Sequence, residues 1–408
     1  MTSITIYKTM VFVFILSFAL GGYVLESLGI RYVSEGGNPL FKIHVVTYIL
    51  IFSVMSLTLK KGVTKPLANL ESSQSSWLVS MLCIVLVIIY GLVRFGTSGM
   101  AYLVDTMVAP LLAIYLLSQL NYQQKNKLLK LLAYLLFLNS LIAIFEFAVG
   151  KTFVFVEFKN FSHFRSTALL THPLNNALIT AALAPLLMNY TRVPYLIYLA
   201  VSTLALFAYG GRGATGVFLL GMFFLLSVNT PSFIIKGIRI SKMRFAVIQA
   251  LGFIVTIFTM LLVILTPLGA RILSKLHVDP SAQARFDVFI ILEQLSLAEW
   301  LLGASASIME NIKFYIGVNI IENYVVGWIL SFGLFATILL LIACFKIPIH
   351  LIFKSGVQLK VAFLVLLGAS VTNNALTTKT PVLLLFFSCL YLAYVSKRER
   401  NDNKNSVT

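Results

Sequence analysis

The sequence predicts an all-α protein that crosses a membrane many times, and three observations carry this prediction. Hydrophobic residues fill 59% of the 408 positions, and the mean hydropathy is +0.94. Only 11% of the residues are charged, which is too few to cover the surface of a soluble protein of this length. Apolar runs long enough to cross the hydrocarbon core recur about twelve times. We therefore expect a helical bundle of about twelve transmembrane helices, in a single transmembrane domain over residues 1–396.

The predicted spans follow one another along most of the chain. They lie near residues 9–29, 43–59, 77–93, 101–120, 128–149, 174–189, 194–210, 213–228, 245–268, 321–345, 360–372 and 381–396. The first run follows a single Lys8 and has no small-residue cleavage site, so we interpret it as a retained span. The cysteines, Cys83, Cys344 and Cys389, fall within apolar runs, which predicts neither disulfides nor a thiolate metal site. The polar residues 397–408 predict a disordered cytoplasmic tail.

Basic residues concentrate in alternate loops. One set of loops holds 19 of the 31 basic residues and three acidic ones, whereas the other loops and helix ends hold 12 basic and 11 acidic residues. This asymmetry predicts that the basic loops and both termini face the cytoplasm. The net charge of +17 is then a topology signal, and we predict no nucleic-acid partner.

Two external segments interrupt the pattern of short loops, at about residues 150–172 and 269–321. The second is the longer and is expected to carry short helices. Asp279 followed by Pro280 predicts a helix over residues 280–297, because proline is favoured in the first helical turn. This external loop is the part of the chain best suited to form a cap over an external site.

Arg212 lies in the sequence Tyr209-Gly210-Gly211-Arg212-Gly213-Ala214, between two apolar runs. A cation at a membrane boundary is costly unless an anion meets it. Glycines allow the backbone to break and to approach a ligand, and the start of the next helix directs free N–H groups to the same place. This pattern predicts that Arg212 helps to hold a phosphate; the alternative is an arginine that extends to the membrane surface.

Three arginines, Arg165, Arg212 and Arg285, lie on the predicted external side. Guanidinium groups stay charged and donate two parallel hydrogen bonds, which suits the binding of a diphosphate. The alternative is ion pairing with nearby acidic residues, among them Glu157, Asp287, Glu293 and Glu322.

Three residues are candidates for a proton acceptor near the arginines. His163 and His172 flank Arg165, and histidine exchanges a proton near neutral pH. Glu322 precedes Asn323 and Tyr324 where the long external segment re-enters the membrane, and partial desolvation suits a carboxylate there to accept a proton. The alternatives are a backbone hydrogen bond for each histidine and an ion pair for Glu322.

Other polar residues receive a structural interpretation. Asp105 and Glu146 are expected to be ion partners inside the bundle, and the external turn around residues 373–379 is expected to be a solvated loop, with sugar binding as the alternative. No His, Asp and Glu set has the spacing of metal ligands, and no nucleotide-binding motif is present, so we expect neither a metal nor a cofactor.

Four short motifs follow one another over residues 150–345. They are Arg165-Ser-Thr-Ala with His172-Pro173-Leu-Asn175, then Gly-Gly-Arg212-Gly-Ala, then Ala-Arg285-Phe-Asp-Val-Phe with Leu302-Gly303, and last Glu322-Asn323-Tyr324 with Phe332-Gly333. Their order resembles that of the motifs in the bacterial O-antigen polymerase and O-antigen ligase superfamily. An exopolysaccharide branch is one part of this superfamily to which the motifs are similar. The first five spans match this superfamily only in hydropathy. Ligases often have His-Asn where this chain has Glu322-Asn323.

The resemblance implies a GT-C-like fold and an inverting, metal-independent glycosyltransferase. Its substrate is expected to be an undecaprenyl-diphosphate-linked glycan, polymerised on the periplasmic face into an O-antigen, capsule or exopolysaccharide. Arg165, Arg212 and Arg285 match the phosphate-binding arginines, and Glu322, His172 and Arg212 are the expected catalytic residues. His163, Asn323 and Tyr324 are further candidates for substrate binding.

Expected partners are membrane lipids and other polysaccharide-assembly proteins, such as a flippase or a chain-length regulator. Two other functions stay open at this point. One is a ligase that transfers the glycan to lipid A core or to a protein. The other is a transporter or flippase for lipid-linked glycan, which we expect to lack a long external segment.

Overall fold

The computed structural model describes residues 1–34, 36–97, 99–154, 164–227, 292–305 and 323–405, with Ile321 and a few residues between 241 and 257. Every regular element in these ranges is helical, which confirms the predicted all-α fold class. The elements are α1 (Ser3–Ala19), α2 (Gly22–Ser27), η1 (Pro39–Lys42), α3 (Val45–Lys61), α4 (Thr64–Ala68), η2 (Glu71–Ser73), α5 (Gln74–Phe95), η3 (Leu103–Val108), α6 (Ala109–Leu117), α7 (Tyr122–Val149), α8 (Pro173–Leu187), η4 (Met188–Tyr190), α9 (Tyr195–Tyr209), α10 (Arg212–Ser227), α15 (Leu297–Leu302), α17 (Tyr324–Phe353), α18 (Val357–Ser370) and α19 (Val382–Asn405).

Three helical stretches of the described chain are long and apolar enough to cross a membrane. They are Glu71–Phe95, α7 and α17. Shorter apolar helices accompany them: Ser3–Ala19, Leu103–Leu117, Tyr195–Tyr209, Arg212–Ser227 and Val357–Ser370. Each predicted span coincides with a described helix except 245–268, which lies mostly outside the described residues. The chain is thus compatible with a membrane protein, whereas the count of twelve spans stays a prediction.

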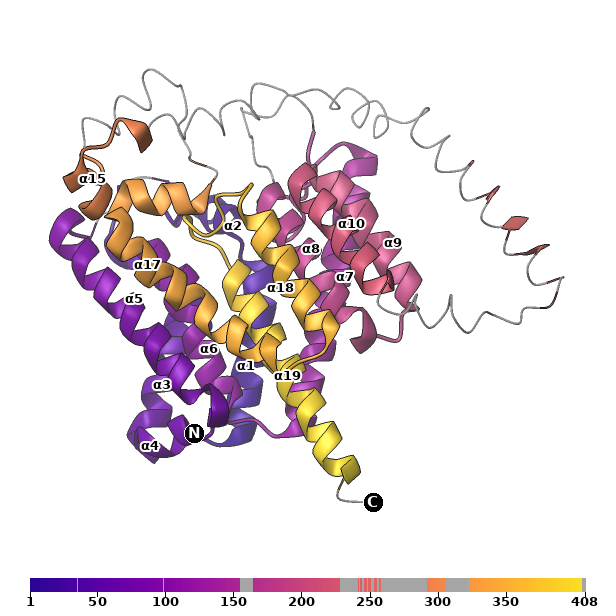
Figure 1. The fold of residues 1–408 in the computed structure, drawn as a ribbon, viewed down its shortest axis with the longest axis horizontal. Helices are drawn as coiled ribbons and strands as arrows, with labels where there is room; N and C mark the ends of the chain where they lie inside the picture. The colour runs from indigo at the N-terminus through magenta and orange to yellow at the C-terminus, as the bar shows by residue number, and fades with distance from the viewer. Residues whose placement is uncertain are drawn as a thin grey trace.

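Helix α8 packs against α7, α9, α10, α18 and α19, and Figure 1 shows it in a group with α7, α9 and α10. All of its 15 residues except Leu174 are buried. Alanines along it, such as Ala177 and Ala181, let neighbouring helix backbones approach closely. The position of α8 matters for function because its first residues follow the 165–172 segment directly.

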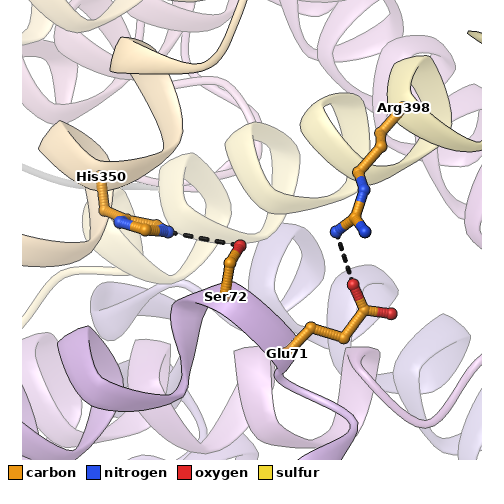
Figure 2. Close-up of polar contacts among 4 residues, drawn as sticks. All are labelled: Glu71, Ser72, His350 and Arg398. Carbon is orange, nitrogen blue, oxygen red and sulfur yellow. Dashed lines mark hydrogen bonds and ion pairs between the residues drawn. The ribbon is translucent and has the colours of Figure 1, made fainter.

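Both termini lie at the same end of the bundle. Ser3 at the start of α1 donates to Gln124 in the first turn of α7 across 2.6 Å. Figure 2 shows the turn η2 at this end: Glu71 forms an ion pair with Arg398 of α19 at 2.5 Å, and Ser72 lies 3.4 Å from His350 of α17. This end carries the basic residues that the sequence grouped with the termini; its assignment to the cytoplasm still rests on the positive-inside rule.

Helix α17 breaks at Gly333, whose φ of 79° lies in the left-handed region. A Cβ at this position would stand 2.2 Å from the carbonyl oxygen of Leu301 in α15, so a side chain has no room there. Arg94 of α5 donates to the carbonyls of Gly303 and Ala304 at 2.9 and 2.7 Å. The chain around α15, at the end of the predicted external segment, is therefore fastened onto α5 and α17. The predicted helix over residues 280–297 lies mainly outside the described residues.

Helix α19 continues to Asn405, whereas we expected a disordered tail from residue 397. The residues that follow Tyr394 include several lysines and arginines, which have high helix propensity. A polar composition alone therefore did not determine where the last helix ends.

Candidate functional site

The segment of residues 165–172 is fixed to α7 by a buried carboxylate. Glu146, which is 1% exposed, accepts hydrogen bonds at 2.8 Å from the backbone N–H groups of Thr167, Ala168 and Phe153. We expected Glu146 to be an ion partner inside the bundle, but these three contacts are with neutral backbone donors. Charge-assisted hydrogen bonds of this kind are the stronger ones in proteins. Glu146 therefore determines the path of the backbone that carries Arg165.

Buried amides hold the same segment from the other side. Asn176 of α8 donates to the carbonyl of Thr167 at 2.6 Å, and Asn139 of α7 accepts from the N–H of Leu169 at 3.0 Å. These contacts maintain a backbone that is locally strained, because Thr171 has a φ of 57°. A β-branched residue rarely adopts such a conformation, and the cost is on the order of 1–3 kcal/mol. The segment is thus built to present its side chains in one arrangement.

The turn that carries Arg212 lies beside this segment. Helix α9 ends at Gly210, which has the left-handed φ of 70° expected of a glycine after a helix, and α10 begins at Arg212. The N–H of Ser166 donates to the carbonyl of Ala208 at 3.1 Å. The residue after Arg165 is therefore bonded to the last turn before Arg212. Arg165 is partly exposed and Arg212 is exposed.

Two glycines let this turn approach its neighbours. A Cβ on Gly211 would stand 2.5 Å from the Cβ of Ala177 in α8, and a Cβ on Gly213 would stand 2.3 Å from the hydroxyl of Thr372. Both distances are shorter than real side chains tolerate. The glycines around Arg212 thus bring α10 against α8 and against the turn between α18 and α19, as the sequence pattern predicts for a close backbone approach.

His172 is the N-cap residue of α8. Its Nδ1 accepts from the N–H of Asn175 at 3.4 Å. Burial, and then the neighbouring charge of Arg165, lower the pKa of His172 to about 4. The ring is therefore neutral near pH 7, and with Nδ1 as an acceptor its proton lies on Nε2. This state suits His172 to donate a hydrogen bond and makes it a weak proton acceptor.

The turn between α18 and α19 is buried at residues 373–376 and partly exposed at residues 377–379, although we expected a solvated loop. Asn373 is 4% exposed and Asn374 is 8% exposed. Asn373 donates to the carbonyl of Leu174 at 2.9 Å and accepts from the N–H of Ala375 at the same distance. A Cβ on Gly327 of α17 would stand 3.1 Å from Thr377. The turn therefore connects the start of α8 with the start of α17.

A second buried carboxylate, Asp105, joins several elements that line the cavity described below. Asp105 lies in the π-helical element η3 and is 5% exposed. It accepts from the hydroxyl of Tyr32 at 2.8 Å, from the hydroxyl of Thr47 at 2.6 Å, and from the N–H of His44 at 3.0 and 3.1 Å. These donors occupy the carboxylate, which we expected to be an ion partner. A π-helical turn inside a bundle often marks a functional site.

Thr106, the residue after Asp105, is hydrogen-bonded to the α18–α19 turn. Thr106 donates to the carbonyl of Thr378 at 2.7 Å and accepts from the N–H of Thr380 at 3.1 Å. Lys379 between them donates to the carbonyl of Tyr32 at 2.6 Å, and its Nζ lies 4.6 Å from the centre of the Tyr32 ring. Element η3 thus joins the loop before α3 to the α18–α19 turn.

These elements enclose a cavity of about 390 Å³. Its lining combines the ends of the segments described above, among them Tyr32, His44, Asp105, Thr171, His172, Asn175, Asn374 and Lys379. The volume falls within the range of about 300–1,000 Å³ that is typical of small-molecule sites. His172 connects the cavity with the Arg165–Arg212 region.

The structure brings together some of the predicted residues. Arg165, His172 and Arg212 lie at one end of the bundle, whereas Arg285, His163 and Glu322 are outside the described residues. Asn323 caps α17 by accepting from the N–H groups of Val325 and Val326 at 3.0 and 3.3 Å. Tyr324 is 4% exposed and packs edge-on against Trp328, with ring centres 4.9 Å apart. Asn323 therefore caps a helix and Tyr324 packs in the core, so both residues have a structural role.

No protein-family model matches the sequence, and neither does any curated protein. The resemblance of the motifs to a superfamily therefore stays an expectation.

Sequence reasoning missed Tyr32, His44 and Thr106, whereas Lys379 belongs to the polar turn for which sugar binding was the alternative. Tyr32 and His44 come from the chain before α3, and Thr106 comes from a π-helical turn. No local motif joins these three residues. A further signal was Asp105, an acidic residue inside a predicted span.

Proposed function

We propose that the protein is an integral-membrane glycosyltransferase that joins lipid-diphosphate-linked oligosaccharide units. The observation that carries the proposal is the position of Arg165 and Arg212 on two segments that are bonded to each other, while His172, which senses the charge of Arg165, lines the nearby cavity. Two fixed cations on joined segments, together with a cavity whose lining includes hydroxyl and amide groups, suit a substrate with an anionic diphosphate and a neutral sugar. Polymerisation of undecaprenyl-diphosphate-linked repeat units is the reaction that fits best.

In this reaction an acceptor hydroxyl oxygen forms a bond to the anomeric carbon of the donor. The bond between that carbon and the diphosphate oxygen breaks, and its electron pair stays on the lipid diphosphate. Arg165 and Arg212, with Arg285 as the third arginine of the proposal, neutralise the charge that develops there. Stabilisation of developing charge by fixed donors is often the largest contribution to catalysis. Attack from the face opposite the leaving group inverts the anomeric centre.

The proton of the acceptor hydroxyl passes to a base. The lowered pKa of His172 makes it a poor choice for this role, because a neutral imidazole with this pKa is a weak base near pH 7. We therefore assign the base to Glu322 and give His172 the part of a hydrogen-bond donor. His163 stays the alternative base.

A strain that lacks the protein tests the proposal through its glycan profile. For a polymerase we expect single repeat units to remain on the lipid at the external face. Complete polymer stranded on the lipid indicates a ligase instead. Lipid-linked units that accumulate at the cytoplasmic face indicate a transporter and contradict the proposal. Re-expression of the Arg31→Ala variant, which removes an exposed arginine outside the cavity lining, serves as the matched control.

A further inference from the structure

We propose that the 390 Å³ cavity binds a neutral sugar ring, and that Thr171 and Asn175 hydrogen-bond its hydroxyl groups. The assignment of this sugar as the acceptor end of the glycan rests on the proposed function. The binding itself does not, because it follows from the chemistry of the lining.

Thr171 provides the first observation. Its side chain is fully buried, and its Oγ1 has no hydrogen-bond partner. A Cβ on Gly21 would stand 2.3 Å from this Oγ1, so the hydroxyl lies against the backbone of another residue of the cavity lining. Buried hydroxyl groups nearly always have a partner, so one without a partner in a residue that lines a cavity is a candidate to bond a ligand.

Asn175 provides a second, independent observation. It lies in the first turn of α8, is 8% exposed and lines the same cavity, and its Oδ1 also lacks a partner. An amide oxygen accepts a hydrogen bond from a hydroxyl group, and a threonine hydroxyl can both donate and accept. Asn374, Thr377 and Thr378 add further neutral polar groups to the lining. This combination matches a ring that carries several hydroxyl groups.

The charged groups of the lining are engaged with the protein. The carboxylate of Asp105 accepts from Tyr32, Thr47 and the N–H of His44. The ammonium of Lys379 donates to a backbone carbonyl and lies over the Tyr32 ring. His172 is neutral near pH 7, because burial and the charge of Arg165 lower its pKa. The cavity therefore favours a neutral polyol, while the Arg165–Arg212 region suits the anionic diphosphate.

The test uses variants that keep the shape of the side chain and remove its polar group. Thr171→Val and Asn175→Leu remove the atoms that lack partners, so the ligand-free protein should be as stable as the wild type or more stable. Thr167→Val is the matched control, because Thr167 lies in the same segment, is 1% exposed and also has an Oγ1 without a partner, but is not in the cavity lining.

The full-length protein is reconstituted in phospholipid nanodiscs, since sugar detergents would compete for the site. Binding of cellobiose, lactose and chitobiose is measured by saturation-transfer NMR, with inorganic pyrophosphate as the anionic probe. We expect at least one disaccharide to bind the wild type and Thr167→Val equally. Each of Thr171→Val and Asn175→Leu should weaken that binding about 3- to 10-fold. Pyrophosphate should not compete.

Three results would overturn the inference. They are no disaccharide binding to the wild type, equal binding by the two cavity variants, and displacement of the disaccharide by pyrophosphate. The proposed function is judged separately. Sugar binding that depends on Thr171 and Asn175 in a protein without transferase activity would support the sugar site and contradict the enzyme. Transferase activity in the wild type, together with unchanged sugar binding in the cavity variants, would support the enzyme and contradict the sugar site.

Discussion

The backbone N–H of Ser166 donates a hydrogen bond to the carbonyl of Ala208 across 3.1 Å. This contact joins the residue after Arg165 to the helical turn that ends just before Arg212. The two arginines are 47 positions apart in the sequence, and the mutual packing of α7, α8 and α9 brings their segments together. The contact is the structural basis for treating both arginines as parts of one site.

Arg165→Ala and Arg212→Ala are each expected to lower polymer formation by a factor on the order of 10²–10³, because each removes a fixed donor to the leaving diphosphate. Arg212→Lys should stay poor, since an ammonium group lacks the planar pair of donors. Polymer is measured in a strain without the chromosomal copy, at matched protein levels in the membrane. Wild-type polymer in either alanine variant would remove that arginine from the mechanism, while Arg31→Ala should be normal.

The lowered pKa of His172 predicts a pH-dependent stability. The ordinary pKa is 6.5 and the value in the folded protein is about 4. The unfolded chain therefore binds the proton more readily between these values, and stability should fall as the pH drops from 6.5 toward 4, by at most about 1.4 kcal/mol per pH unit from this group. Thermal unfolding of the wild type and His172→Asn across this range gives the comparison. An identical slope in both proteins would mean that His172 does not titrate as described.

Glu146→Gln should destabilise the protein by about 2–3 kcal/mol, because an amide leaves the buried N–H groups of Thr167 and Ala168, and the partly buried N–H of Phe153, without an ionised acceptor. The matched variant is Glu71→Gln at the other end of the bundle. Its side chain is 61% exposed and pairs with Arg398, so its loss should cost less than about 1 kcal/mol. Chemical unfolding of both variants measures the difference. Equal effects would show that the Glu146 contacts do not hold the 165–172 segment.

Gly211→Ala should lower both stability and activity. Its Cβ would stand 2.5 Å from that of Ala177 on the buried helix α8, and such overpacking costs about 1–3 kcal/mol. Gly216→Ala, one and a half turns further along α10, meets nothing within 4 Å and should be neutral or stabilising. The expression level and melting temperature of the two variants test this. A normal Gly211→Ala protein would indicate that α10 and α8 can separate without loss.

Much of the helical architecture follows from hydropathy, because a long apolar run has few alternatives to a helix in a membrane. The Arg212 turn was also predictable, since glycines beside a charge are unusual between apolar runs. The break at Gly333 was not, because it lies inside one continuous apolar run and depends on contact with Leu301. The burial of Asn373 and Asn374 was missed for a related reason. Their polarity indicates a solvated loop, whereas their partners are carbonyls and N–H groups brought close only by the fold.

The most direct test of the proposed function is reconstitution of the purified protein in liposomes with an undecaprenyl-diphosphate-linked repeat unit as the sole glycan substrate. We predict a ladder of longer lipid-linked glycans, with one undecaprenyl diphosphate released for each new linkage, and no ladder with the Arg165→Ala, Arg212→Ala double variant. Glycan that remains at single-unit length while the lipid-linked substrate crosses the bilayer would contradict the account and identify a transporter.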